Sequence, residues 1–282
     1  MSKRKRAKTS SSEQLLRIER SDLSLIIYRN IIFCRDRHVS FHIGSDYKVI
    51  MIVDGHGISN FVIDYVIARL PVIMADTLLG ATCRESVEEG IREAFKRTEK
   101  EVDSVFKEGG CVVGCIIRYK DYIFMVQCGN LKICSVSESG SVMYDMPRHD
   151  ISNEYEVFRV KKRNIFEGYL FGYLKTFRGF GHYNCRQDTI TNTLYSKDFK
   201  GCKNKYISTP TIAVFKHKEK FMYVIASDGM LENTSNCPKR NFQTEIREFM
   251  ATGLSISQAL FQICERSSKY EHDDITMIAS NF

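Results

Sequence analysis

Three aspartates share one sequence context, in which the acid lies at the end of an apolar run. Asp54 and Asp228 each follow such a run, and Asp273 comes just before one. If these runs are neighbouring strands, their ends bring several negative charges together, and such charges stay ionised only beside a cation. Mg²⁺ and Mn²⁺ prefer carboxylate, carbonyl and water oxygens. The pattern indicates a divalent-metal site; three unrelated turn aspartates are the alternative.

The first acid opens the stretch Asp54-Gly55-His56-Gly57. The two glycines permit a sharp turn and let the backbone approach a ligand closely. His56 lies between them and is a candidate acid or base, although a histidine that makes only a local hydrogen bond in the turn would give the same sequence. An amphipathic helix follows the turn, so a strand and a helix hold the carboxylate between them.

Composition and charge restrict the class of protein. The chain has 282 residues, of which 43% are hydrophobic, enough for one large domain or two small ones. Its net charge of +7 is uneven, because residues 1–9 hold five basic side chains and no acid, and residues 159–205 hold 11 lysines and arginines against three acids. The start has no apolar signal-peptide region and no run is long enough to span a membrane. The ten cysteines mostly lie in apolar runs and are expected to be buried thiols of a reducing compartment. We expect the cytoplasm, the nucleus or both, because the basic cluster is of the kind used in nuclear import.

Hydrophobic periodicity predicts the elements that position these residues. A helix follows residue 57 and is expected to end near Leu70, because Pro71 interrupts it. The clearest helix spans residues 85–107, and two more span residues 241–250 and 255–266. Residues 146–206 form a long irregular segment rich in glycine, aromatic and basic residues, called the excursion below. Strands are predicted at residues 23–33, 39–43, 48–53, 111–118, 122–127, 131–136, 211–215, 221–226 and 274–280.

The order of these elements predicts the fold class. Residues 35–38 are expected to join two strands, and the three runs between 111 and 136 are expected to form hairpins. Helices come in pairs between groups of strands, which argues for antiparallel sheets with helical layers and against a doubly wound parallel sheet. The prediction is therefore an α+β fold.

Three sequence blocks resemble the signatures of the metal-dependent serine/threonine protein phosphatases of type 2C. They are residues 53–57 (Val-Asp-Gly-His-Gly), 226–232 (Ala-Ser-Asp-Gly-Met-Leu-Glu) and 272–276 (His-Asp-Asp-Ile-Thr), in the family's order and at its wide spacing. Weaker matches lie at residues 110–113, 126–132 and 172–182. The resemblance covers nearly everything after a basic tail at residues 1–13, which we expect to be disordered, so residues 14–282 are expected to be one phosphatase domain.

The resemblance implies a central β-sandwich of two antiparallel sheets flanked by pairs of α-helices, in four αββα layers, with two Mg²⁺ or Mn²⁺ ions at one end. By position, Asp54 would bridge both metals and the Gly55 carbonyl would bind one, while Asp228 and Asp273 would complete the first. A metal-bound water would attack phosphorus in line, and His56 would protonate the departing serine or threonine oxygen.

The sequence departs from the family at three positions. The family's Glu-Asp pair corresponds to Arg35-Asp36, so Asp36 is kept as a metal residue but an arginine replaces the glutamate. Asn130 replaces an aspartate tied to an additional, weaker metal, and His182 replaces the aspartate that closes its block. The second metal site is therefore expected to be weak. Arg35 is the predicted phosphate-binding residue, with Arg29 and Arg37 as alternatives.

Three functions follow from these features. The first is an active phosphatase on phosphoserine and phosphothreonine of other proteins, favoured because His56 and the three metal aspartates are retained. The second is a pseudophosphatase that binds partners without turnover, favoured by Arg35, Asn130 and His182. The third is nucleic-acid binding through the basic, aromatic excursion, which we do not expect because those aromatics are better explained as packing on the core. We expect a monomer that binds no membrane.

Overall fold

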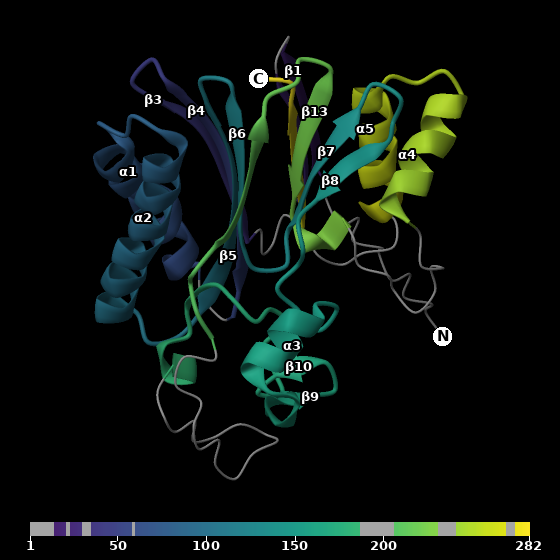
Figure 1. Cartoon of the computed structure of the whole chain (residues 1–282). Helices are drawn as coiled ribbons and strands as arrows, with labels where there is room; N and C mark the ends of the chain where they lie inside the picture. Colours follow the sequence, from purple (N-terminus) through teal and green to yellow (C-terminus); the bar gives the residue numbers. More distant parts are fainter. Residues whose placement is uncertain are drawn as a thin grey trace, which may run out of the picture.

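Two antiparallel β-sheets stacked face to face form the centre of the molecule, with helices on both outer faces (Figure 1). The computed structural model describes residues 14–20, 23–29, 35–57, 60–186, 206–230, 241–268 and 274–282. The predicted tail at residues 1–13 and the predicted metal residue Asp273 lie outside the described residues.

The first sheet takes its strands from both ends of the chain. Every neighbouring pair in it is antiparallel. In order across the sheet the strands are β1 (Gln14–Arg20), β2 (Leu23–Arg29), β14 (Ile275–Ser280), β13 (Phe221–Ala226), β7 (Lys132–Ser137) and β8 (Val142–Asp145).

The second sheet is also antiparallel throughout. Its strands in order are β12 (Thr211–Lys216), β6 (Tyr122–Cys128), β5 (Gly110–Tyr119), β4 (Tyr47–His56) and β3 (Asp36–Ile43), and the short β11 (Phe180–Gly181) pairs with the start of β5.

The apolar run in β4 is continuous because both faces of the strand are buried. Successive side chains of a strand point to opposite faces. Ile50 and Ile52 pack in the cluster between the two sheets, with residues such as Ile133 and Ile225. The intervening Val49, Met51 and Val53 pack against the outer helices. β4 is therefore held rigidly from two sides, and so is the acid near its end.

Helices α1 (Phe61–Leu78) and α2 (Arg84–Val105) cover the second sheet, and α4 (Phe242–Ala251) and α5 (Ile256–Ser268) cover the first (Figure 1). Each helix buries one apolar stripe, as its sequence period predicts. The four αββα layers predicted from the sequence are confirmed. Among the described residues, no helix combines the length and the apolar character needed to cross a membrane.

The prediction that a helix ends near Leu70 is wrong, because α1 continues through Pro71 to Leu78. A proline inside a helix removes one backbone hydrogen bond. Here the buried side chains Leu70, Ile73, Met74 and Leu78 continue the apolar stripe past the proline. Their burial outweighs the lost bond.

Two predicted strand connections are also wrong. β2 and β3 belong to different sheets, so residues 35–38 are not a hairpin turn and Asp36 already lies in β3. β6 and β7 also belong to different sheets, and the link at Gly129 and Asn130 crosses from one to the other. Pattern alone does not reveal this, because a turn and a crossover both use short polar segments.

The excursion contains more regular structure than the sequence predicts. It includes α3 (Glu154–Val160), two short strands β9 (Ile165–Phe166) and β10 (Tyr169–Leu170), and β11. Asn153 caps α3 by accepting the backbone N–H groups of residues 155 and 156. A small separate core holds the excursion together, made of Val160, Leu170, Phe171, Leu174, Phe177, Cys185 and Tyr206.

The cysteines for which the structure gives a state have free thiols, and Cys111, Cys115, Cys128, Cys134 and Cys264 are buried as predicted. Burial raises the pKa of the Cys134 thiol to about 12. A thiol with such a pKa is not ionised at neutral pH and packs as a small apolar group.

Candidate active site

Asp36 and Asp54 lie directly opposite each other in the pairing of β3 with β4. Opposite residues of an antiparallel pair have Cβ atoms about 5 Å apart. Asp36 is only 2% exposed. Two carboxylates placed this closely, one of them buried, favour a cation between or beside them.

The carboxylate of Asp228 receives two donors on one oxygen. The Asn130 side-chain amide donates to Oδ2 over 2.7 Å, and the ammonium of Lys175 lies 3.1 Å from the same atom. The Asp228 side chain is 9% exposed, and that of Lys175 is 42% exposed. Asp228 opens a short 3-10 helix, Asp228–Met230, just after β13, whereas Lys175 comes from the excursion. A positive charge of the chain itself therefore binds this acid.

Backbone contacts bring Asp54 and Asp228 to the same end of the sandwich. The backbone N–H of Arg35 donates to Oδ2 of Asp274 over 2.7 Å, which joins the start of β3 to the start of β14. Gly229 packs closely against the backbone of Asp274. A Cβ atom at position 229 would overlap the carbonyl oxygen of Asp274. The segments that carry Asp36 and Asp228 therefore meet at Asp274.

A second link runs through Gly129. This glycine has φ +134° and packs on Val112, leaving no room for a side chain. Val112 is the partner of Asp54 in the pairing of β4 with β5. The next residue, Asn130, binds Asp228. The segment at Gly129 and Asn130, which joins the two sheets, thus contacts the strand partner of Asp54 on one side and Asp228 on the other.

His56 ends β4 and is half-buried in a cluster of aromatic side chains. Its Nδ1 lies 2.7 Å from Nε2 of His182, and the Tyr206 hydroxyl lies 3.3 Å from its Nε2. The planes of the two imidazole rings are nearly parallel, with 4° between them. One proton is shared between the two facing nitrogens. His182 reaches this place because Gly110, the β-sheet partner of His56, offers no side chain in its way.

Burial, together with the smaller effect of the nearby charge of Arg35, lowers the pKa of His56 to about 4. The imidazole is therefore neutral at pH 7 in the metal-free protein. The effect of Arg35 places its positive charge near His56, at the end of the sandwich where the predicted phosphate site lies.

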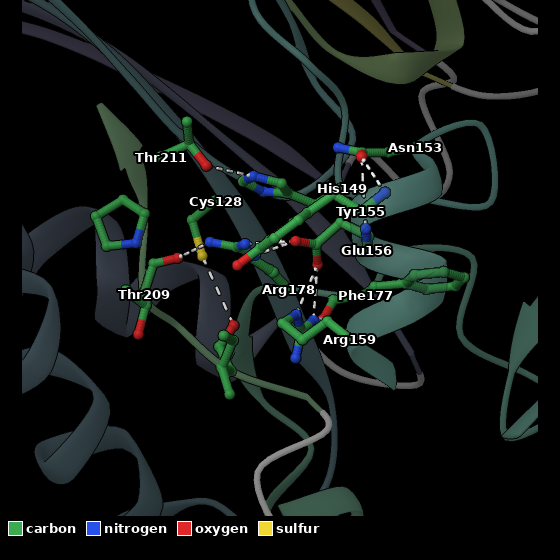
Figure 2. Close-up of polar contacts among 12 residues, drawn as sticks. Cys128, His149, Asn153, Tyr155, Glu156, Arg159, Phe177, Arg178, Thr209 and Thr211 are labelled. Carbon is green, nitrogen blue, oxygen red and sulfur yellow. Dashed lines mark hydrogen bonds and ion pairs between the residues drawn. The ribbon is translucent and has the colours of Figure 1, made fainter. Parts of the chain in front are cut away.

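Two buried groups of the excursion support this arrangement (Figure 2). Nδ1 of His149 accepts the N–H of Gly129 over 3.0 Å, so its Nε2 carries the proton and donates to Oγ1 of Thr211 over 2.8 Å. The backbone N–H of His149 donates to the Gly129 carbonyl over 2.9 Å. His149 therefore holds the backbone of Gly129 in place. Gly129 directly precedes Asn130, whose side chain binds Asp228.

The other group is the buried carboxylate of Glu156 in α3. It binds the guanidinium groups of Arg159, at 2.7 Å, and Arg178. Arg178 also donates to the Thr209 carbonyl over 2.8 Å, and Arg159 to the Phe177 carbonyl over 2.9 Å. Burial by itself would raise the pKa of Glu156, but the hydrogen bonds from the two arginines lower it, so the acid is ionised. This network holds α3 to the strand that follows the excursion.

Carboxylate and carbonyl oxygens suit a hard divalent cation, and the candidates at this end are the carboxylates of Asp36, Asp54 and Asp228 and the carbonyl of Gly55. Within the described ranges, which omit Asp273, no three acidic, histidine or cysteine side chains form a group that could hold a metal. Lys175 supplies a positive charge at Asp228. A metal at this acid must therefore displace the lysine or share the carboxylate with it.

Sequence reasoning found most of these residues but missed three. Five predicted residues lie at one end of the sandwich together with the backbone of Arg35: Asp36, Asp54, Gly55, His56 and Asp228. Asn130 and His182 were noted only as departures from a family pattern. The contacts of Lys175, Tyr206 and His149 were not predicted. For Lys175 there was a signal: it is the single charge in the otherwise uncharged and largely apolar run 168–177.

No protein-family model matches this sequence, and no curated protein is similar to it in sequence. Solved structures are similar in fold. A phosphatase from a pathogenic strain of Toxoplasma gondii superposes with a TM-score of 0.70 at 12% identity, covering 95% of this chain and 96% of that one. The serine-threonine phosphatase 2C of T. gondii gives 0.61 at 12% identity, over 94% and 98%. A sex-determining protein of C. elegans gives 0.64 at 16% identity, over 95% of this chain.

This chain spans only 64% of the length of the C. elegans protein. At these identities the likeness concerns the fold alone. The chain has the fold of the type 2C protein phosphatases, as its three acid blocks predicted.

Proposed function

We propose that this chain is a metal-dependent phosphatase that hydrolyses phosphoserine and phosphothreonine in other proteins. The observation that supports the proposal is the pairing of Asp36 with Asp54, near His56, and the link from this pair through Gly129 and Asn130 to Asp228, in a fold like that of a type 2C phosphatase. Asp54, Asp228, Asp273 and the Gly55 carbonyl would hold Mg²⁺ or Mn²⁺, with Asp36 beside them. The bound metal would supply a water acidic enough to attack phosphorus at neutral pH.

The chain's own residues would bind the phosphate and move the proton. Nδ1 of His56 faces His182, so Nε2, the nitrogen nearest the Tyr206 hydroxyl, would donate to the departing oxygen. Its low pKa in the metal-free state means that the incoming phosphate dianion must help to protonate it. Arg35 is exposed and its charge reaches His56, which supports a role in holding that dianion.

A second candidate is a pseudophosphatase that binds phosphorylated proteins without hydrolysing them. The pair of donors on Asp228 favours it, because Lys175 and Asn130 together can satisfy this carboxylate without a metal. Arg35 at the position of a metal-site glutamate acts in the same direction, since a cation repels a cation. Both candidates use the same phosphate-binding end of the sandwich.

Hydrolysis of a phosphothreonine peptide separates the two candidates. The purified protein is assayed in EDTA, Mg²⁺ or Mn²⁺, beside Asp228→Asn. Turnover that needs a metal and is lost in the variant supports the phosphatase. If the folded protein binds the phosphopeptide but does not hydrolyse it at any Mn²⁺ concentration, the pseudophosphatase replaces it.

A further inference from the structure

The excursion exposes large apolar side chains on α3 and in the turn just before it. Phe158 is 84% exposed, Tyr155 68% and Ile151 50%. The opposite side of α3 is buried, through Glu156 and Val160. Single exposed apolar residues are ordinary, but several gathered on one element mark an interaction surface.

Two of these side chains, Ile151 and Phe158, border a groove of about 750 Å³. Its walls are Ile151, Val157 and the ring of Phe158, and its lining is mainly apolar. Lys161 and Lys162, both exposed, also line it. Arg159 contributes to the lining while its guanidinium is held by Glu156. The groove is therefore apolar along its walls and basic where α3 ends.

The backbone at Lys161 supports a use for its side chain. Lys161 has φ +68° and ψ +126°, a conformation that glycine adopts readily and lysine does not. Strain of this kind tends to collect at functional positions. The strained backbone and the positive charge therefore both indicate a functional role for Lys161, because glycine would adopt this conformation with less strain.

We propose that this groove docks an acidic segment of a partner protein, with one bulky apolar side chain of that segment seated against Phe158. Lys161 and Lys162 would pair with the segment's acids, which gives the charge complementarity that selects this class of partner. A membrane surface is the other class that such a mixture can attract. A concave groove of this size fits a single bulky side chain better than a flat lipid surface.

The groove is also preorganised for binding. Glu156 is bound by Arg159 and Arg178, so α3 is fixed to the rest of the chain and loses little freedom on docking. Lys175 and His182 belong to the same excursion. A protein docked on α3 is thus held by the same segment that contributes Lys175 and His182 to the candidate active site, which would raise the effective concentration of any phosphorylated residue it carries. The docking itself does not depend on turnover.

Selection from a phage-displayed library of random short peptides tests the proposal with the full chain, using counter-selection on Phe158→Ala. We expect peptides that combine aspartate or glutamate with one leucine, phenylalanine or similar residue. In fluorescence anisotropy with a recovered peptide, Phe158→Ala should weaken binding about tenfold or more. Lys162→Glu should weaken it less and reduce its salt dependence.

Matched controls keep the test specific. Leu79→Ala removes another exposed apolar side chain, 63% exposed, at the end of α1, and Lys96→Glu reverses an exposed charge on α2. Both variants should bind the peptide normally. Lys161→Gly should bind more weakly and yet unfold at higher urea, because it loses the charge and relieves the backbone.

Three results overturn the proposal. The first is that no acidic peptide is enriched in a manner that depends on Phe158. The second is that the peptides bind Phe158→Ala and Leu79→Ala equally. The third is binding to phosphatidylserine vesicles that needs Phe158 when peptide binding does not, which would make the face a lipid contact. A lack of phosphatase turnover leaves each of these measurements intact.

Discussion

Replacing Lys175 by methionine should tighten the binding of Mn²⁺ to this protein. The change keeps the length and packing of the side chain but removes the ammonium group that lies 3.1 Å from Oδ2 of Asp228. In the wild-type chain a metal at this acid must displace that charge. In the variant it meets only the amide of Asn130.

The size of the effect follows from the burial of the pair. Two unit charges at this distance attract by about 5 kcal/mol in a medium of effective dielectric constant about 20. Lys175 is 42% exposed, so water screens most of this energy. Exposed pairs contribute about 0.2–1 kcal/mol and hydrogen bonds to charged groups about 1.5–3 kcal/mol. A value of about 1–2 kcal/mol lies between these ranges, and it corresponds to an affinity gain of about 5–30-fold.

Isothermal titration with Mn²⁺ measures this gain directly and needs no substrate. Lys132→Met is the matched control, because Lys132 forms a comparable pair with Asp145, 2.6 Å apart, on strands β7 and β8. It should leave the affinity for Mn²⁺ unchanged. Asp228→Asn should lose the metal in either background.

The reasoning is refuted if Lys175→Met binds Mn²⁺ no more tightly than the wild type while Asp228→Asn abolishes binding. In that case the metal and the lysine occupy different sides of the carboxylate. If neither protein binds Mn²⁺, the residues at this end do not form a metal site and the pseudophosphatase is favoured.

Three further predictions concern stability. Burial lowers the pKa of His149 to about 3, so below about pH 6.5 the unfolded chain binds a proton that the native chain does not bind. The free energy of unfolding measured in urea should therefore fall as the pH is lowered from about 6.5 to 3, by up to about 1.4 kcal/mol per pH unit. His149→Gln should flatten this dependence. Glu156→Ala leaves two buried or half-buried arginines without their acid and should cost about 3–5 kcal/mol in urea unfolding, whereas Glu154→Ala, an exposed neighbour, should cost almost nothing. Gly110→Ala places a carbon 2.7 Å from the Phe180 carbonyl oxygen and against His182, so it should cost about 1–3 kcal/mol and alter the proton NMR signals of the histidine pair; unchanged signals would contradict the packing described.

Much of the fold could be predicted because burial leaves a periodic record in the sequence. α2 and strands β4, β5, β6 and β13 each place apolar residues at the spacing of one element, so they were located to within a few residues. The record fails where burial is small. β8 is mostly exposed, and α3 has only 7 residues, too few for its apolar period to stand out. Neither element was predicted.

The candidate site divides in the same way. The acids were found because each lies where a buried run ends, which is a local property of the sequence. The contact between Lys175 and Asp228 joins residues from separate parts of the chain. The lone charge at Lys175 stands out in the sequence, but nothing near either residue indicates which partner it binds. His149 was missed for a similar reason, since its partners Gly129 and Thr211 lie on opposite sides of it in sequence. Such contacts depend on the topology, and the predicted hairpins had given part of the topology incorrectly.

The strand order has a consequence for the connectivity of the molecule. Every described strand after the turn at Glu167 and Gly168 pairs with a strand that precedes this turn: β10 with β9, β11 with β5, β12 with β6, β13 with β7, and β14 with β2. The two halves of the chain are therefore interleaved in both sheets. Neither half has a complete sheet of its own, so neither should fold alone. Two separately expressed halves should instead assemble into one sandwich, and the candidate active site, which takes Asp54 from one half and Asp228 from the other, would exist only in their complex.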